Sequence, residues 1–332
     1  MSISNNILHH IENFTAQRDK ELLAFSLLKS IRNILSPAQS SIITLNKRDE
    51  PTMEITLTGG DRCTFNHSNI ELSPEVRKSI DYMNAWHLEE FVDAYEDHHL
   101  SIHLLKQSRQ HAQYLIVTLD KKPSKSENYI IKGMLSIYSN FSSLLIEAQT
   151  DELTGLMNRK TFEESIVKLH NNQNTDDSSQ NDQSNWIAII DLDHFKSIND
   201  NYGHLYGDEV LIHVSRVMQH TFRMDDLLFR FGGEEFVVLM KHRTKQECED
   251  LLETLRQNVQ QIQLPKIDAI SVSIGACQFQ EDIFHITLID QADQALYYSK
   301  QNGRNRVTFF DHVVSEGLAV DSQVHSGDID LF

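Results

Sequence analysis

The sequence predicts a mixed α/β (α+β) protein with two domains, and three observations support this. The chain has 332 residues, which is more than one average domain needs. Hydrophobic residues make up 40% and charged residues 23%, proportions that allow two packed cores and exclude wholesale disorder. Strand-type and helix-type apolar patterns alternate along the chain, so each half is expected to combine strands with helices.

The charge balance restricts the class of partner. Lys and Arg number 30 against 48 Asp and Glu, which gives a net charge of −18. Such a chain repels polyphosphate, so we expect no nucleic acid and no anionic membrane as partner, while a small anion held by a few local cations stays compatible. No signal peptide is visible, and apolar runs of about five residues fall short of the ~20 that span a membrane. The three cysteines lie far apart and form no CxxC pair, which indicates a reducing compartment without a disulfide framework or a zinc site. Together these features predict a cytoplasmic protein.

Residues 1–127 are expected to form an α+β module. Apolar periodicity predicts a helix over 5–35, which Pro37 ends, and another from Ser73 to about Tyr95. Strand-type segments cover 41–45, 53–58, 62–65, 102–105 and 114–119. The module contains no chemical motif, and its histidines show no recurring metal-ligand spacing.

A helix is predicted to link the two domains over 128–149. Its apolar residues are spaced 3-4-3-4-3, the pattern of a coiled-coil seam, which favours a homodimer. The seam consists of Ile131, Met134, Tyr138, Phe141, Leu145 and Ala148. It covers about two and a half heptads, so a plain amphipathic helix packed on its own domain is a nearly equal alternative.

The second domain is expected over 150–312, with an acidic, mobile tail over 313–332. We expect helices at 159–169, 208–220, 245–260 and 291–301, strands at 186–192, 269–275 and 307–310, and a hairpin around Gly232-Gly233. A polar low-complexity stretch at 171–185 predicts a loop.

Two segments of this domain carry acids at places suited to chemistry. An apolar strand ends in Asp191 and Asp193, which places carboxylates where a strand emerges into a cleft. Helix capping is the favoured alternative for Asp193. The hairpin places Glu234 and Glu235 directly after its glycine pair, which is also compatible with a solvated tip. Together, glycines that let a phosphate approach and acids on adjacent strands indicate a Mg²⁺ site.

These segments resemble the GGDEF family, the diguanylate cyclases, in its common GGEEF form. The resemblance rests on five ordered motifs: DELTGLMNR at 151–159, DLDHFKSINDNYGHLYGD at 191–208, RFGGEEF at 230–236, SVSIGA at 271–276 and ADQALYYSKQNGRN at 292–305. It covers about residues 149–311 and departs from the family only at Ser299, where Ala is usual, and in the polar loop at 171–185.

The resemblance implies a palm-like fold, with a central antiparallel sheet flanked by helices, and a reaction. Two GTP molecules condense into cyclic di-GMP, each 3′-hydroxyl attacking the α-phosphate of the other nucleotide and releasing pyrophosphate. Asp191, the Leu192 carbonyl and Glu234 would hold Mg²⁺, with Mn²⁺ as an alternative. Glu235 would assist the 3′-hydroxyl, although the sequence leaves open which glutamate is the base. Lys196 would counter the charge of the transition state.

The resemblance also assigns the residues that bind GTP. Backbone amides around Phe195 and Lys196 would hold the β- and γ-phosphates at a helix start. Lys300 and Arg304, four apart on one helical face, would supply further cations. Asn199 and Asp208 would read the guanine edge, with His204 nearby. From the residues alone, Asp208 is equally explained as a helix cap, and the Phe195 side chain is better explained as core.

Two regulatory expectations complete the prediction. Arg223 and Asp226 form an RxxD pair whose Asp lies six residues before Gly232. This composition and this spacing resemble the family's inhibitory site for cyclic di-GMP. Without the fixed spacing, an ion pair on the surface would be the preferred explanation. The layout of residues 1–127 resembles a GAF-like sensory domain, with a PAS-like domain as the alternative, and its signal is unknown. The alternative function is a catalytically silent module that senses cyclic di-GMP or GTP.

Overall fold

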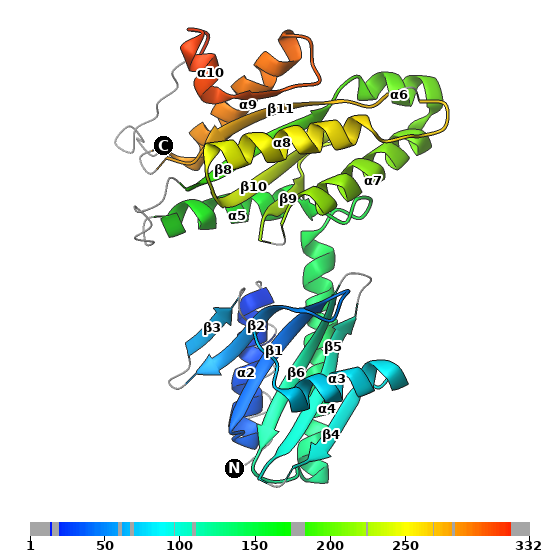
Figure 1. Ribbon diagram of the computed structural model, residues 1–332, viewed down its shortest axis with the longest axis vertical. Coiled ribbons are helices and arrows are strands. Elements are labelled where there is room, and N and C mark those ends of the chain that lie inside the picture. Colours follow the sequence, from blue (N-terminus) through cyan, green and yellow to red (C-terminus); the bar gives the residue numbers. More distant parts are fainter. Residues whose placement is uncertain are drawn as a thin grey trace, which may run out of the picture. The chain divides into compact units, whose positions relative to one another are not determined.

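The chain divides into two compact units between Ala148 and Gln149. The computed structural model describes residues 14, 20–58, 62–66, 70–95, 97–107, 111–173, 183–223, 225–267, 269–280 and 283–319. Each unit contains a six-stranded sheet with helices packed on it (Figure 1). Within these residues no helix is long and apolar enough to cross a membrane.

The N-terminal unit is an antiparallel sheet covered on both faces. Its elements are α2 (Lys20–Leu35), β1 (Gln39–Asn46), β2 (Pro51–Thr58), β3 (Arg62–Asn66), α3 (Pro74–Trp86), β4 (Glu90–Ala94), β5 (His99–Gln107), β6 (His111–Leu119) and α4 (Lys125–Gln149). The strand order is β3-β2-β1-β6-β5-β4. Side chains alternate along each strand, so one face packs against α2 and α4 and the other against α3.

One helix prediction in this unit is tested in part and another is wrong. Of the helix predicted over 5–35, residues 5–13 and 15–19 lie outside the described part of the chain, and the described part ends at Leu35 as predicted. The second helix does not run to Tyr95: it ends at Trp86, because His87 takes a left-handed conformation (φ 52°) and closes the last turn. Residues Glu90–Ala94 then pair with β5 as an edge strand, which suits the aromatic and β-branched pair Phe91-Val92.

The first half of the predicted seam is used inside the N-terminal unit. Ile131, Met134 and Tyr138 are at most 5% exposed and pack into the core formed with α2 and β6. Burial raises the pKa of Tyr138 to about 12. Phe141 and Leu145 are partly buried against the same core. The alternative of an amphipathic helix packed on its own domain therefore holds for Ile131, Met134 and Tyr138, whose side chains are buried within the unit.

The C-terminal unit confirms the antiparallel sheet flanked by helices. Its elements are β7 (Met157–Asn158), α5 (Arg159–Gln173), β8 (Ser184–Leu192), α6 (Phe195–Tyr202), α7 (His204–Thr221), β9 (Leu227–Arg230), β10 (Glu235–Arg243), α8 (Lys245–Gln260), β11 (Val272–Gln278), α9 (His285–Gln301), β12 (Val307–Phe309) and α10 (Phe310–Ser315). The order is β12-β11-β8-β10-β9-β7, antiparallel from β11 to β9, with the outer strands β12 and β7 parallel to their neighbours.

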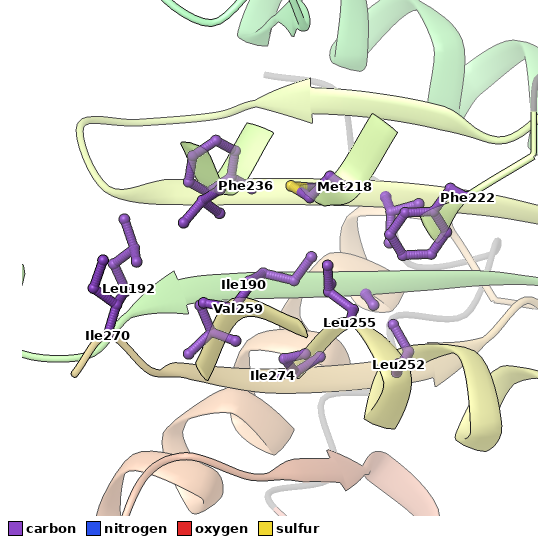
Figure 2. Close-up of a cluster of buried hydrophobic side chains, with 14 of the residues drawn as sticks. Ile190, Leu192, Met218, Phe222, Phe236, Leu252, Leu255, Val259, Ile270 and Ile274 are labelled. Atoms are coloured by element: carbon purple, nitrogen blue, oxygen red, sulfur yellow. The ribbon is translucent and has the colours of Figure 1, made fainter. Parts of the chain in front are cut away.

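The central strand β8 is buried on both faces. Ile190 and Leu192 point into a cluster closed by α7 and α8, where Met218 and Leu255 meet them (Figure 2). The alternate residues of β8 face α5 and α9. A Cβ atom on Gly275 would lie 2.1 Å from the Leu296 backbone nitrogen, so α9 can pack directly on β11 only with glycine there. This packing fixes the end of β8, where the site lies.

The end of this unit folds further than predicted. Instead of a tail that starts at 313, Phe310–Ser315 form α10, and Val313 is 3% exposed. Residues 320–332 lie outside the described part of the chain, as do residues 174–182 of the predicted polar loop.

Candidate active site

The sheet ladder brings the predicted metal-binding residues together. Asp191 lies at the end of β8, and Glu235 is its direct partner on β10. The Leu192 backbone N–H donates to the Glu234 carbonyl at 3.3 Å, so the loop that carries Glu234 is tied to the end of β8. The Asp191 side chain is buried at this strand end. Residues more than forty positions apart thus meet at one edge of the sheet.

The site holds negative charge that its own cations only partly balance. Lys300 Nζ lies 2.9 Å from Asp191 Oδ2. Burial nevertheless raises the pKa of Asp191, because desolvation outweighs the attraction of Lys300. Burial and then the charge of Asp191 raise the pKa of Glu234. Two acids with raised pKa values side by side indicate a place where a bound cation would be stabilised.

This donor set fits Mg²⁺. Asp191 and Glu234 supply hard carboxylate oxygens, and the Leu192 carbonyl lies between them in the chain. Among the described residues there is no cluster of three or more His, Cys, Asp or Glu side chains able to hold a metal. An ion here would therefore take part of its coordination from backbone, water or a bound phosphate, as Mg²⁺ does at nucleotide sites.

The Glu235 side chain folds over the first glycine of the hairpin tip. A Cβ atom on Gly232 would lie 2.6 Å from Glu235 Oε2, so a larger residue there would displace the end of this side chain. Gly233 has open space around it, and its carbonyl accepts from Arg230 Nη2 at 2.9 Å. The Phe231 and Gly232 backbone N–H groups donate to the Glu235 carbonyl at 2.8 and 3.2 Å, which keeps Glu235 beside the tip.

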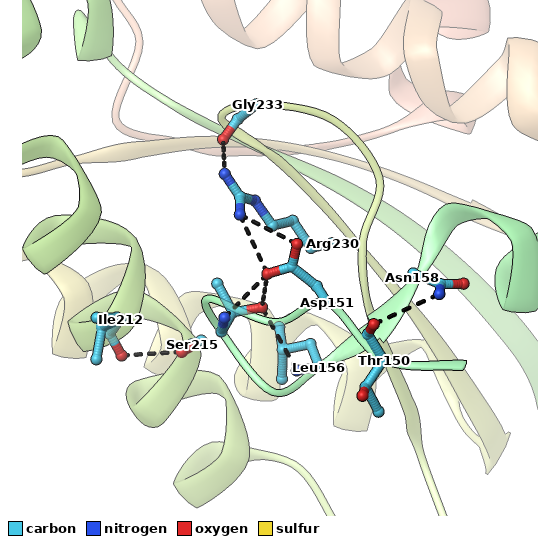
Figure 3. A network of polar contacts seen from close by, with 9 residues as sticks. Thr150, Asp151, Leu156, Asn158, Ile212, Ser215, Arg230 and Gly233 are labelled. Carbon is cyan, nitrogen blue, oxygen red and sulfur yellow. Dashed lines mark hydrogen bonds and ion pairs between the residues drawn. The ribbon is translucent and has the colours of Figure 1, made fainter. Parts of the chain in front are cut away.

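Arg230 also ties the hairpin to the segment that follows α4. Its Nη1 lies 3.1 and 3.2 Å from the two carboxylate oxygens of Asp151 (Figure 3). Asp151 Oδ1 also accepts from the Thr154 backbone N–H at 2.9 Å and hydroxyl at 2.7 Å. Burial raises the pKa of Asp151, but these hydrogen bonds outweigh it and hold the pKa below its usual value. The sequence motifs at 151–159 and 230–236 are thus parts of one network.

The start of α6 offers backbone donors, as predicted. Ser197 and Ile198 donate to the His194 carbonyl, so the amides of Phe195 and Lys196 belong to the first turn, which has no intrahelical acceptors. The Phe195 side chain is 6% exposed and packs in the core, while the Lys196 side chain is exposed. At Phe195 only the backbone is therefore open to a ligand.

The residues predicted to read the base lie next to each other. A Cβ atom on Gly207 would be 2.0 Å from Asn199 Oδ1, so the start of α7 packs closely on the Asn199 amide. Asp208 follows Gly207 inside α7, whose N-cap is Gly203, and the helix-capping alternative for Asp208 is therefore wrong. His204 is exposed at the first turn of α7.

The predicted helical face shared by Lys300 and Arg304 does not exist. Helix α9 ends at Gln301, and Arg304 lies beyond it in a turn with φ 61°. Gly303 (φ 106°) provides the left-handed conformation that breaks the helix. The charge of Arg304 still acts on Asp191 and draws the pKa of that carboxyl down, against the effect of burial. Both cations serve the site, but from different local structures.

Asp193 has a role that sequence reasoning missed. It does not cap α6, whose N-cap is His194. Its carboxylate accepts from Ser271 Oγ and Ser273 Oγ, both at 2.6 Å, and from the Asn305 backbone N–H at 3.0 Å. The alternating serines of the SVSIGA motif were the available signal, since hydroxyls on a buried strand need an acceptor.

Only one member of the predicted RxxD pair is exposed. Arg223 is exposed, but the Asp226 side chain is fully buried and lies 2.5 Å from Arg243 Nη2. Asp226 also accepts from the Arg223 backbone N–H at 3.0 Å. Burial raises the pKa of Asp226 in spite of Arg243. Asp226 Oδ1 accepts from the Lys241 backbone N–H at 3.4 Å, so in this conformation Asp226 holds the turn that carries Arg223 and both of its oxygens have partners within the protein.

An antiparallel sheet that ends in paired carboxylates, with a helix N-terminus and basic side chains in the same unit, is an arrangement that can hold a cation and phosphate groups. Residues 148–306 match the family model described as "Diguanylate cyclase, GGDEF domain". The C-terminal unit is therefore a GGDEF domain.

Named relatives match over the same region. Diguanylate cyclase A of Treponema denticola is 34% identical over 183 residues, which are 54% of this chain and 48% of that protein. Diguanylate cyclase DgcM of Escherichia coli K12 is 38% identical over 160 residues, 48% of this chain and 38% of that protein. The chain thus spans about half or less of the length of these relatives. The solved GGDEF domain of DgcB from Caulobacter crescentus, in complex with c-di-GMP, is 32% identical and covers 49% of this chain and 96% of its own, with a TM-score of 0.45.

Proposed function

We propose that this protein is a diguanylate cyclase, which condenses two GTP into cyclic di-GMP and two pyrophosphates. The observation that carries the proposal is the cluster of Asp191, Glu234 and Lys300 at the strand ends of a GGDEF domain. Paired acids with raised pKa values, placed beside a lysine, suit charge neutralisation at a phosphorus centre. The named relatives at 34% and 38% identity support the same reaction.

The proposed roles combine the family resemblance with the positions of these residues in the sheet and helices. Asp191, the Leu192 carbonyl and Glu234 would hold Mg²⁺ or Mn²⁺, which supplies neutralisation of charge on the phosphates. Glu235 takes the proton of the 3′-hydroxyl, the new bond joins that oxygen to the α-phosphorus, and the α–β phosphoanhydride bond breaks.

Pyrophosphate is the leaving group, held by the amides of Phe195 and Lys196 at the start of α6. The side chains of Lys196, Lys300 and Arg304 balance its charge. The same step, repeated with the nucleotide roles exchanged, closes the ring.

The proposal requires two copies of the chain. Each site takes one GTP, so ring closure needs two sites that face one another, and we propose a homodimer. We further propose that the N-terminal unit, as a GAF-like or PAS-like sensory domain, sets how often the sites meet. Its signal is unknown. Helix α4 is the covalent connection between the units.

Direct assay of the reaction tests the proposal. The full chain, confirmed as a dimer by light scattering, is incubated with GTP and Mg²⁺, with Mn²⁺ in a parallel reaction. We expect stoichiometric pyrophosphate and cyclic di-GMP. A dimer that binds GTP or cyclic di-GMP but forms neither product would instead support the silent sensing module.

Base selectivity gives a first prediction. Because an Asp carboxylate accepts from guanine N1–H and the 2-amino group, Asp208 should favour GTP over ATP, which has an acceptor at N1. Asp208→Ser should raise the ratio of ATP to GTP consumption by about tenfold or more, since a bidentate contact is lost for guanine only. Competition assays with both nucleotides measure this ratio. An unchanged ratio in the variant, or efficient mixed product from the wild type, contradicts the assignment.

Product inhibition gives a second prediction. We propose that Arg223, which is exposed beside the hairpin base, binds cyclic di-GMP through its guanidinium, while Asp226 holds the turn that carries it. Arg223→Ala should leave the initial rate nearly unchanged and prevent progress curves from levelling off early. Pyrophosphatase and excess GTP exclude other causes of levelling. If early levelling persists in the variant, Arg223 does not mediate inhibition.

A further inference from the structure

The turn that carries Arg304 has an unusual backbone. Arg304 (φ 61°) and Asn305 (φ 45°) are consecutive residues in the left-handed region. Asparagine tolerates this conformation, but arginine rarely adopts it. Such residues persist only where surrounding contacts enforce the conformation. The contacts of this turn therefore hold Arg304 in a conformation that it would not adopt by itself.

Asp193 is the principal contact. Its Oδ2 accepts from the Asn305 backbone N–H at 3.0 Å and from Ser271 Oγ at 2.6 Å. Its Oδ1 accepts from Ser273 Oγ at 2.6 Å. The residue is 5% exposed, so these bonds form away from water. Both oxygens are in use, which leaves Asp193 unsuited to hold a metal although it stands two residues after Asp191.

A second contact holds the other side of Asn305. Arg256 Nη1 on α8 donates to Asn305 Oδ1 at 2.7 Å. Glu253 in turn holds Arg256 Nε and Nη2 at 2.8 and 2.6 Å. The backbone and the side chain of Asn305 are thus fixed from two places, the segment directly after β8 and helix α8.

We infer that Asp193 is a positioning residue for Arg304, which it presents to the phosphate groups of a nucleoside triphosphate. The Arg304 backbone N–H bonds to the Ser299 carbonyl at 3.0 Å, and Lys300 reaches Asp191 at 2.9 Å, so the turn begins at the site. Asp193 anchors its far end. A turn fixed at both ends holds the Arg304 backbone in place, so its guanidinium starts from a fixed point beside the site before substrate arrives. This inference rests on the proposed function, in which Arg304 binds phosphate.

Binding of 3′-deoxy-GTP to the full chain tests the inference, because this nucleotide lacks the reacting hydroxyl and is not turned over. Arg304→Ala and Asp193→Ala should each weaken its binding by about tenfold or more, the loss of one charged contact. The double variant should bind no more weakly than either single variant, since both remove the same interaction. In turnover assays Asp193→Ala should raise KM for GTP more than it lowers kcat.

A second pair of variants keeps the test decisive if Asp193→Ala does not fold. Glycine at 305 adopts the left-handed conformation and keeps the N–H, whereas β-branched valine resists it. Asn305→Gly should bind within about threefold of wild type, and Asn305→Val as weakly as Arg304→Ala. Ser299→Ala is the matched control: it removes a buried hydroxyl bonded to the Ile274 carbonyl, outside the Asp193 contacts, and should bind normally.

The outcomes separate the inference from the proposed function. If Arg304→Ala binds 3′-deoxy-GTP as wild type does, the phosphate-binding role of Arg304 fails and the inference falls with it. If Arg304→Ala weakens binding while folded Asp193→Ala or Asn305→Val does not, the inference alone is overturned. Additive losses in the double variant would likewise overturn it, because Asp193 would then act by another route.

Discussion

Replacing Glu234 with alanine should lower cyclic di-GMP formation by about a hundredfold or more, as expected when a group that stabilises transition-state charge is removed. Stability should not fall with activity. In the folded chain the pKa of Glu234 is raised by burial and by Asp191, so the ionised carboxylate is unfavourable there without a cation. Glu234→Ala removes this repulsion and no core volume, and the melting temperature should stay the same or rise slightly.

The measurement combines a pyrophosphate release assay with thermal unfolding of the full chain. Glu164→Ala, which removes an exposed glutamate from α5 in the same unit, is the control and should retain wild-type rate. Mn²⁺ titration followed by electron paramagnetic resonance reports metal affinity separately, and it should fall in Glu234→Ala only. A variant that keeps more than about a tenth of the wild-type rate would contradict the role of Glu234 as a metal ligand.

The motif residues of the site were predictable because each depends on local structure that the sequence encodes. An apolar run followed by Asp191 predicts a strand end, and a glycine pair followed by Glu234 and Glu235 predicts a hairpin tip. Pairing these strands in register then places the acids together without further information. The pairing of Asn199 with Asp208 came instead from the family resemblance, and the structure puts them on the two consecutive helices that follow β8.

Predictions failed where tertiary contacts decide between local alternatives. The apolar seam of α4 has the same spacing whether its partner is another helix or the sheet beneath it, and burial of Met134 in the sheet core settles this only in the structure. Arg304 follows Lys300 at helical spacing, but Gly303 ends the helix between them. In the sequence Asp226 belongs to an RxxD pair with Arg223, but in the structure its carboxylate forms a buried ion pair with Arg243. Arg243 lies outside every motif that the sequence shows, so this pairing could not be predicted.

Arg243→Met should be among the most destabilising substitutions in the C-terminal unit. It leaves the fully buried Asp226 without its ion-pair partner, which costs about 3–5 kcal/mol. For a unit of this size the melting temperature should fall by about 6–20 °C. The double variant Asp226→Asn with Arg243→Met should recover most of this loss. Asparagine can still accept from the Arg223 backbone N–H, and no unpaired charge remains.

The pH dependence of Arg243→Met distinguishes lost charge pairing from lost packing. Burial already raises the pKa of Asp226, and without Arg243 the pKa must rise further. The folded state then binds a proton that the unfolded state releases, so stability falls as pH rises through this range. Calorimetry at about pH 5 and pH 8 should therefore show a smaller deficit, relative to wild type, at the acidic pH. An equal deficit at both pH values would mean that the Arg243 side chain stabilises the fold by filling space. Methionine is a suitable substitute because it fills similar space with an unbranched chain. It also loses no hydrogen bond at Nε, since the Arg243 Nε is buried with no hydrogen-bond partner among the described residues.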